Sequence, residues 1–355
     1  MASIYQEVYI IILGLICSYA FISIGDSSSP NFRENGIKKI WVNVLCLLVV
    51  AYIGFRPLIG YDMLGYLIAY NEGYVSDKEP GLWIVGKFCR LLNLNSQGWF
   101  FVVALIYFCS YLVACRNFSK RHGDYIYLSF LVAFSTFAYS TNTIRNGLAM
   151  SLVILAMSYN KVGGFRKRLI SLVFFYFALM THKTTILPIL CFFLAHKITF
   201  KHSLYFWGAA VVLSLIMGNQ ISNIFLNLGF DDRLDQYLLS DDRTGFKYSG
   251  FRWDFLLYSV APIVLGYVVS IKRKIVDSQY SILLVTYVLT NAFWVMVIKA
   301  QFSDRFAYLS WFMYPIVLIY PILTMNVWTK NQGKYVKIIL FAHLFFTMFM
   351  TLIYY

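Results

Sequence analysis

Charged side chains are scarce in this chain of 355 residues: they make up 13% of it, whereas a soluble domain has about 25%. Hydrophobic residues make up 60%, well above the range of a soluble domain. So little charge excludes an ordinary soluble protein. Apolar segments of about 20 residues, the length that crosses a bilayer, recur from Ile4 to Tyr355. The sequence therefore predicts an all-α integral membrane protein.

The motifs of several soluble enzyme classes are also missing. The chain has no GxxxxGK(S/T) loop, no GxGxxG after a strand, no GxSxG and no HExxH. Nucleotide-driven chemistry therefore has no support. The cysteines form no CxxC pair, and no histidine stands at ligand spacing from them, so we expect neither disulfides nor a metal site, and no cofactor. The six cysteines are Cys17, Cys46, Cys89, Cys109, Cys115 and Cys191.

The apolar segments are close enough together to leave only short polar connections. We found no internal repeat, so we predict a single polytopic membrane domain over residues 1–355 with about 12 transmembrane helices. The predicted spans are 3–24, 38–54, 98–115, 125–141, 145–160, 169–182, 183–197, 203–218, 254–271, 280–298, 306–325 and 336–354.

The net charge of +14 is distributed very unevenly between the two sets of loops that these spans define. One set carries 18 Lys and Arg with four acidic residues, and the other carries 12 basic and 12 acidic residues. Because Lys and Arg accumulate in cytoplasmic loops, the basic set is predicted to face the cytoplasm and both termini to face outward. The excess of positive charge thus indicates topology and not nucleic-acid binding.

Two predicted outer loops, 55–97 and 219–253, are longer than a connection requires. In the first, residues 81–94 place Leu82, Val85, Phe88 and Leu92 at helical spacing. We expect an outer-face interfacial helix there, because the segment is too short to span easily. The second loop carries a run of acidic residues that we interpret as a solvated face.

Ionisable side chains are costly at membrane depth, so those at helix ends on the outer side are candidates for function. Arg145 stands between two apolar runs, where its guanidinium could hold a phosphate through two hydrogen bonds. The alternative is an interfacial arginine that reaches lipid headgroups. His182 could act as an acid or base, or could be a hydrogen-bonded interhelical histidine beside an interfacial Lys183.

Asp62 follows Gly60 in an irregular segment, which suits a general base that must reach a hydroxyl group. It could equally cap a helix that starts near Met63. Asp304 and Arg305 could contribute to a site or form a structural ion pair. Tyrosine, tryptophan and phenylalanine side chains are expected mostly at lipid or interfacial positions, and some could stack on sugar rings.

An outer site lacks cytoplasmic nucleotides, so its substrate must carry its own activation. A sugar linked to a lipid through a diphosphate does so, because the diphosphate is a good anionic leaving group that basic residues would stabilise.

Several of these segments together resemble the EpsG family of polysaccharide polymerases, which is related to the Wzy-type O-antigen polymerases. The resemblance follows G-x-D in GFRPLIGYDMLGYLIAY, E-P in KEPGLWIVGKF, I-R-x-G-(L/I)-A in STNTIRNGLAMSL and F-H-x-(S/T) in FALMTHKTTILPIL. FSDRFAYLSWFMYP is similar to the family's late arginine segment. The family often has Arg-Gln where this chain has Arg145 and Asn146.

The resemblance implies a glycosyltransferase-C-like fold and the joining of undecaprenyl-diphosphate-linked oligosaccharide repeats into O-antigen or a related surface polysaccharide. It implies a multi-pass protein of the bacterial cytoplasmic (inner) membrane, with the active site facing the periplasm or outside. Its partners would be the lipid-linked oligosaccharide, membrane lipid and a chain-length regulator protein, without nucleic acid. The implied diphosphate ligands are Arg56, Arg145 and Arg305. Asp62 is the first candidate for the general base and His182 the second, with Glu79 and Asp304 as orienting or acceptor-side groups and Lys183, Asn146 and Tyr66 in support.

Two other functions fit the same features. An O-antigen ligase or another transferase with a polyprenyl-linked donor would keep the basic diphosphate site and use a different acceptor hydroxyl. A flippase or transporter would move the lipid-linked sugar without breaking a bond. Transporters often contain repeats and broken helices, whereas here no repeat is visible and the ionisable groups gather at one face.

Overall fold

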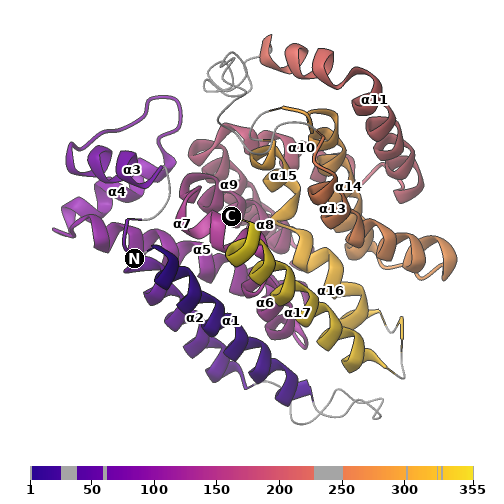
Figure 1. Cartoon of the computed structure of the whole chain (residues 1–355), viewed down its shortest axis with the longest axis horizontal. Coiled ribbons are helices and arrows are strands. Elements are labelled where there is room, and N and C mark those ends of the chain that lie inside the picture. The colour runs from indigo at the N-terminus through magenta and orange to yellow at the C-terminus, as the bar shows by residue number, and fades with distance from the viewer. Residues whose placement is uncertain are drawn as a thin grey trace. The chain divides into compact units, whose positions relative to one another are not determined.

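The computed structural model describes residues 2–24, 38–58, 62–227, 251–300, 303–325, 327–328 and 331–354. These residues form helices and no strands (Figure 1). They divide into two compact units: unit 1 comprises residues 1–182 and 319–355, and unit 2 comprises residues 183–318. The helical structure and the recurring apolar segments make this an α-helical membrane protein.

Unit 1 is built around α8, which packs along both α5 and α9. Helix α5 also packs against α2 and α6, and α1 packs against α17. The helices are α1 (Ala2–Ile24), α2 (Lys39–Gly54), α3 (Met63–Asn71), α4 (Gly81–Leu91), α5 (Ser96–Phe118), α6 (Gly123–Leu131), α7 (Phe134–Thr141), α8 (Ile144–Val162), α9 (Phe165–Thr181), α17 (Gln332–Phe349) and η3 (Met350–Tyr354). The last turns of α16 (Tyr314–Thr324) also belong to unit 1.

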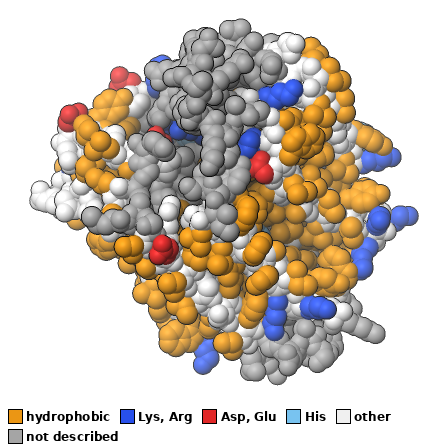
Figure 2. Space-filling view, in the orientation of Figure 1, with side chains coloured by type: hydrophobic (Ala, Val, Ile, Leu, Met, Phe, Trp, Pro, Cys, Tyr) orange, Lys and Arg blue, Asp and Glu red, His pale blue; other side chains and the backbone are white. Residues whose placement is uncertain are grey.

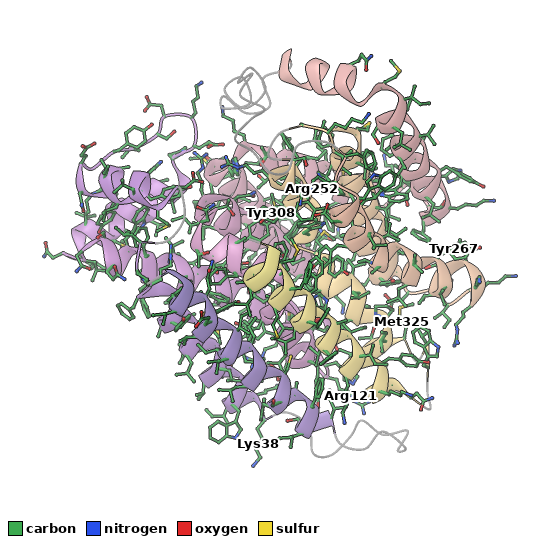
Figure 3. The ribbon with its side chains drawn as sticks, in the orientation of Figure 1. Lys38, Arg121, Arg252, Tyr267, Tyr308 and Met325 are labelled. Carbon is green, nitrogen blue, oxygen red and sulfur yellow. The ribbon has the colours of Figure 1, made fainter. Side chains whose placement is uncertain are left out.

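One end of unit 1 is strongly basic. There the Tyr125 hydroxyl of α6 donates to Ser23 O of α1 at 3.3 Å, and Lys161 at the end of α8 donates to Phe118 O at the end of α5. These bonds bring the helix ends and their connections together. Figure 3 labels Lys38 and Arg121 at this end, which is the lower end of unit 1 in that view. The basic residues here are Lys38, Lys39, Arg116, Lys120, Arg121, Lys161, Arg166, Lys167 and Arg168.

Unit 2 is built around α14 (Ser278–Met296), which packs against α10 (Ile186–Leu194), α11 (Phe200–Asn227), α13 (Trp253–Gly266) and α15 (Asp304–Trp311). The unit also includes η1 (Lys183–Thr185), η2 (Tyr267–Lys272) and the first turns of α16.

A largely buried polar network joins the helices of unit 2. The Trp207 indole of α11 donates to Asn291 Oδ1 of α14 at 2.8 Å, and Asn291 Nδ2 donates to Ser310 Oγ of α15 at 3.1 Å. The Trp311 indole donates to Ser259 Oγ of α13 at 2.7 Å. Hydrogen bonds of this kind hold apolar helices together where the hydrophobic effect cannot.

Seven helical segments among the described residues are long and apolar enough to cross a membrane. Hydrophobic side chains accordingly cover much of the described surface visible in Figure 2. The segments are Ile4–Ile24, Ser96–Phe118, Phe200–Gly218, Trp253–Lys272, Ser278–Met296, Arg305–Thr324 and Gln332–Leu352, and two shorter apolar helices are Lys39–Gly54 and Lys183–Leu194. The predicted number of about 12 crossings is larger and stays a prediction.

The predicted continuous span at 125–141 is wrong, because the chain turns between α6 and α7. The turn leaves carbonyl groups without helical partners, and side chains satisfy them. Thr136 Oγ1 donates to Phe130 O at 2.5 Å, and Thr347 Oγ1 of α17 donates to Val132 O at 2.8 Å. A helix break at membrane depth is tolerated when its free backbone groups are bonded in this way.

The helix expected at 81–94 is α4, and part of its expected apolar face packs inside the protein. Leu82 is fully buried, whereas Phe88 is 57% exposed. The buried face is formed by residues that pack against α3 and α5, and it includes Trp83 and Cys89. Burial of the large indole outweighs the simple spacing pattern. An apolar stripe of Ile84, Phe88 and Leu91 remains exposed, and its interfacial position stays a prediction.

The first residues of the predicted outer loop at 219–253 are helical, because α11 continues to Asn227 beyond a kink at Met217. Its acidic run at 231–242 lies outside the described residues.

Candidate functional site

The end of unit 1 opposite the basic end gathers the candidate residues of that unit. The Tyr5 hydroxyl donates to Tyr52 O at 3.0 Å, which joins the start of α1 to the end of α2. Gln97 Nε2 at the start of α5 donates to Arg56 O at 2.9 Å. Because α8 runs from this end to the basic end, its first turn also lies here. The candidates at this end are Arg56, Asp62, Glu79, Arg145 and His182.

Three of these residues form one ion cluster with Glu79 at its centre. Arg145 Nη1 lies 2.7 Å from Glu79 Oε2, and His182 Nδ1 lies 3.0 Å from Glu79 Oε1. The side chains of Arg145, Glu79 and His182 are 17%, 11% and 12% exposed. In such a partly buried place, a charge-assisted hydrogen bond is stronger than at the surface. The sequence predicts a role for each residue, and the structure adds that one carboxylate joins them.

Helix α8 places Arg145 in its first turn. The chain enters from Thr143, whose carbonyl accepts the Gly147 N–H at 2.9 Å. A Cβ on Gly147 would lie 2.4 Å from Tyr139 O, so glycine is required where α8 meets the last turn of α7. The first turn of a helix carries partial positive charge from its free N–H groups, and Arg145 adds a full charge. This end of α8 is therefore suited to an anion.

The start of α4 and the end of α9 bring Glu79 to His182. His182 is the first residue after α9, in an extended conformation, and its N–H donates to Ala178 O at 2.9 Å. Gly81 begins α4 against the backbone of Thr181, where any larger residue would clash. Sequence reasoning missed this contact, although the glycine of the E-P-G motif was a signal for it.

The connection before α4 is anchored by a regular helix end and by aromatic packing. Gly73 ends α3 with φ of 72°, and the Tyr74 N–H bonds Ala69 O at 2.9 Å, as in a Schellman motif. The rings of Trp83 and Trp99 stack with centroids 5.7 Å apart. Tyr66, a predicted supporting residue, is buried in this cluster with its ring centroid 6.4 Å from that of Trp83.

Asp62 lies directly before α3, where a cap was one interpretation. The helix does start at Met63, but Asp62 makes no side-chain cap hydrogen bond. Its backbone N–H donates to Asn142 Oδ1 at 3.3 Å, which places it beside the connection that leads into α8. Sequence reasoning did not single out Asn142.

Arg56 is almost completely buried, with 2% of its surface exposed. Nη1 donates to Ile53 O at 2.8 Å, Nη2 lies 3.3 Å from Met63 Sδ, and the guanidinium lies 4.9 Å from the centre of the Phe100 ring. Burial lowers the pKa of Arg56 to about 10, so it stays charged at neutral pH. These contacts tie the end of α2 to α3 and α5, and they favour a structural role beside the predicted diphosphate contact.

The other predicted residues divide between the units. Asn146 follows Arg145 in α8; it is 8% exposed, and its Oδ1 is buried without a hydrogen-bond partner. Lys183 begins η1 and Arg305 lies in the first turn of α15, both in unit 2. The backbone of Asp304 begins α15, and its side chain lies outside the described part of the structure.

The cluster combines the groups that a transfer to or from a bound anion requires. A carboxylate only accepts hydrogen bonds, so Glu79 fixes the proton of His182 on Nδ1 and makes Nε2 the basic nitrogen. Arg145 offers five N–H donors in a planar fork, and Glu79 Oε2 contacts one of its nitrogens, Nη1. Within the described ranges, no three His, Cys, Asp or Glu side chains are grouped to hold a metal ion. All six cysteines are free thiols.

Comparison with known proteins gives one family. No curated protein and no solved structure matches the chain. The family model described as the EpsG family matches residues 39–355, which include every candidate residue, the whole of unit 2 and unit 1 except residues 1–38. The chain therefore belongs to the EpsG family.

Proposed function

We propose that this protein is a polysaccharide polymerase that joins oligosaccharide repeats carried on undecaprenyl diphosphate into O-antigen or a related surface polysaccharide. Membership of the EpsG family over residues 39–355 supports a polymerase of this general kind. The observation that supports an active site here is the Arg145–Glu79–His182 cluster, since it joins a strong anion ligand to an oriented imidazole.

In the proposed reaction, Arg145 binds the diphosphate of the donor at the start of α8. A guanidinium matches phosphate oxygens through paired hydrogen bonds, and the helix end adds to the positive potential. Negative charge grows on the diphosphate as its bond to the anomeric carbon breaks, so these groups stabilise the transition state more than the ground state. The energy of that bond drives the transfer.

His182 is the general base that the geometry favours. A hydroxyl oxygen of the acceptor repeat attacks the anomeric carbon of the donor chain, and the hydroxyl proton passes to His182 Nε2. The bond from the anomeric carbon to the diphosphate oxygen breaks, and undecaprenyl diphosphate leaves with the electron pair. Glu79 holds the imidazole through Nδ1, as an orienting carboxylate does in other base-carboxylate pairs. Asp62 remains the alternative base.

The proposal is tested by the length profile of the surface polysaccharide. Cells lacking the gene are complemented with wild type, Arg145→Ala or Arg166→Ala, the last an exposed arginine at the basic end of unit 1. We expect the ladder to collapse to a single repeat without the gene, and to be restored by wild type and Arg166→Ala but not by Arg145→Ala at equal protein level. Complete loss of surface sugar, or an unchanged ladder in the deleted cells, would contradict a polymerase.

We further propose that the cluster faces the outside of the cytoplasmic membrane, in a glycosyltransferase-C-like arrangement. The opposite, basic end of unit 1 supports this orientation. Single cysteines at Glu72, beside α3, and at Lys120, after α5, are both at exposed positions. With a membrane-impermeant thiol reagent added to intact cells, we expect labelling of Glu72→Cys above the wild-type background and protection of Lys120→Cys. The reverse pattern would invert the topology.

A further inference from the structure

Arg145 stands where a helix least favours a cation. The first turn of α8 already has partial positive charge, so an arginine there needs an anion close by. Among the described residues, Glu79 is the group with which its guanidinium pairs, at 2.7 Å. Both are largely buried, which makes the contact stronger than an exposed salt bridge.

The donor diphosphate and Glu79 require the same guanidinium. A diphosphate bound to Arg145 while Glu79 Oε2 stays in place would bring two negative groups into contact in a partly buried site, and their repulsion would weaken binding of the diphosphate. With Glu79 ionised and the imidazole neutral, the cluster of three residues has no net charge, so a weakly charged anion gains little by entering. A diphosphate carries enough charge to compete.

We propose that Glu79 occupies the anion position of Arg145 in the substrate-free protein, and that the donor diphosphate displaces Glu79 Oε2 while Oε1 stays on His182. This inference rests on the proposed function, in which Arg145 binds the diphosphate. It makes Glu79 a positioning residue with two effects: it weakens binding of the donor, and it keeps His182 oriented for the chemical step.

The surroundings of Glu79 allow such an exchange. Its backbone lies in the connection between α3 and α4, with its N–H bonded to Ser76 Oγ at 3.2 Å, and Gly81 fixes the start of α4 against Thr181. The backbone is therefore held, so release of Arg145 requires a movement of the Glu79 side chain alone, with Oε1 as the pivot. The bond to His182 Nδ1 at 3.0 Å limits how far the carboxylate moves.

Binding of inorganic diphosphate to the purified full-length protein in lipid nanodiscs, measured by calorimetry, tests the inference. We expect Glu79→Gln to bind about five- to tenfold more tightly than wild type, because a neutral amide no longer competes for Arg145. Glu79→Ala should change affinity in the same direction and serves if the glutamine variant does not accumulate. Arg145→Gln should lose binding.

Turnover of the lipid-linked repeat provides the second readout. Glu79→Gln should lower KM for the donor and also lower kcat, since His182 loses its carboxylate, whereas a purely structural residue would not lower KM. Equal affinity of wild type and both Glu79 variants for diphosphate, with Arg145→Gln still impaired, would overturn the inference and leave the proposed site. Absence of binding in wild type and in all variants would overturn the diphosphate site itself.

Discussion

Gly81 lies directly against Thr181: a Cβ on Gly81 would lie 2.3 Å from Thr181 Oγ1 and 2.7 Å from its Cα. The contact joins the start of α4 to the end of α9. Glu79 stands two residues before Gly81, and His182 directly follows Thr181. Backbone packing thus holds these two side chains together, in addition to their own hydrogen bond.

Replacing Gly81 with alanine tests this contact. The added Cβ cannot fit against backbone atoms, so α4 must move away from α9 and Glu79 from His182. We expect polysaccharide elongation to fall about tenfold or more, because a misplacement of about 1 Å can cost about 10²-fold in rate. The control is Gly65→Ala in α3, where no atom lies within 4 Å and alanine favours the helix. Wild-type elongation by Gly81→Ala, at equal protein level, would show that the contact does not position the site.

The choice between His182 and Asp62 as general base is tested by replacing each with an amide side chain, which cannot act as a base. Removing a general base typically slows the chemical step about 10²–10⁴-fold with little change in donor binding. We expect His182→Gln to show this loss of kcat and Asp62→Asn to show a smaller one. Steady-state kinetics with lipid-linked repeats measures both. A large loss of kcat confined to Asp62→Asn would assign the base to Asp62.

Arg56 tests the difference between a buried structural residue and a diphosphate ligand. Lysine keeps the charge but loses the paired geometry that reaches Ile53 O. We expect Arg56→Lys to lower the free energy of unfolding by about 1–3 kcal/mol, because a buried acceptor loses its donor. Thermal unfolding in detergent measures the change, with Arg166→Lys as the exposed control. Normal stability combined with loss of elongation would instead support the predicted diphosphate contact.

His122 should make stability depend on pH. It lies before α6 at the basic end of unit 1, and burial, with a smaller effect of Arg121, lowers its pKa to about 4. As pH falls from about 6.5 to 4, the unfolded chain therefore takes up a proton that the folded protein does not, and stability is lost. Since His122 is partly exposed, we expect a loss of about 1–2 kcal/mol.

The control for this prediction is His122→Gln, which cannot titrate. As pH falls from 6.5 to 4, the unfolding midpoint of wild type should fall steadily relative to that of the variant. A difference that stays constant over this range would remove His122 as the cause.

Helix positions were predictable wherever one physical cause dominates. The predicted spans at 3–24 and 98–115 are continuous apolar segments, and the bounds of α1 and α5 agree with them within a few residues. The span at 125–141 failed because its break is stabilised by a hydroxyl from α17, which is distant in sequence. The burial of Trp83 in α4 was not predicted, because the residue packs on Trp99 and local spacing contains no information on that neighbour.

The sequence by itself determined that this protein is a helical membrane protein, which of its loops are basic, and which ionisable residues are unusual at helix ends. Composition and charge suffice for these conclusions because lipid rejects unpaired charge regardless of the fold. Only the tertiary structure decided that Glu79 bridges Arg145 and His182, that Arg56 is enclosed, and that Gly81 meets Thr181. The contacts of Glu79 and Gly81 join residues about 60 to 100 positions apart, and those of Arg56 join three helices, so all of them are set by how the helices pack.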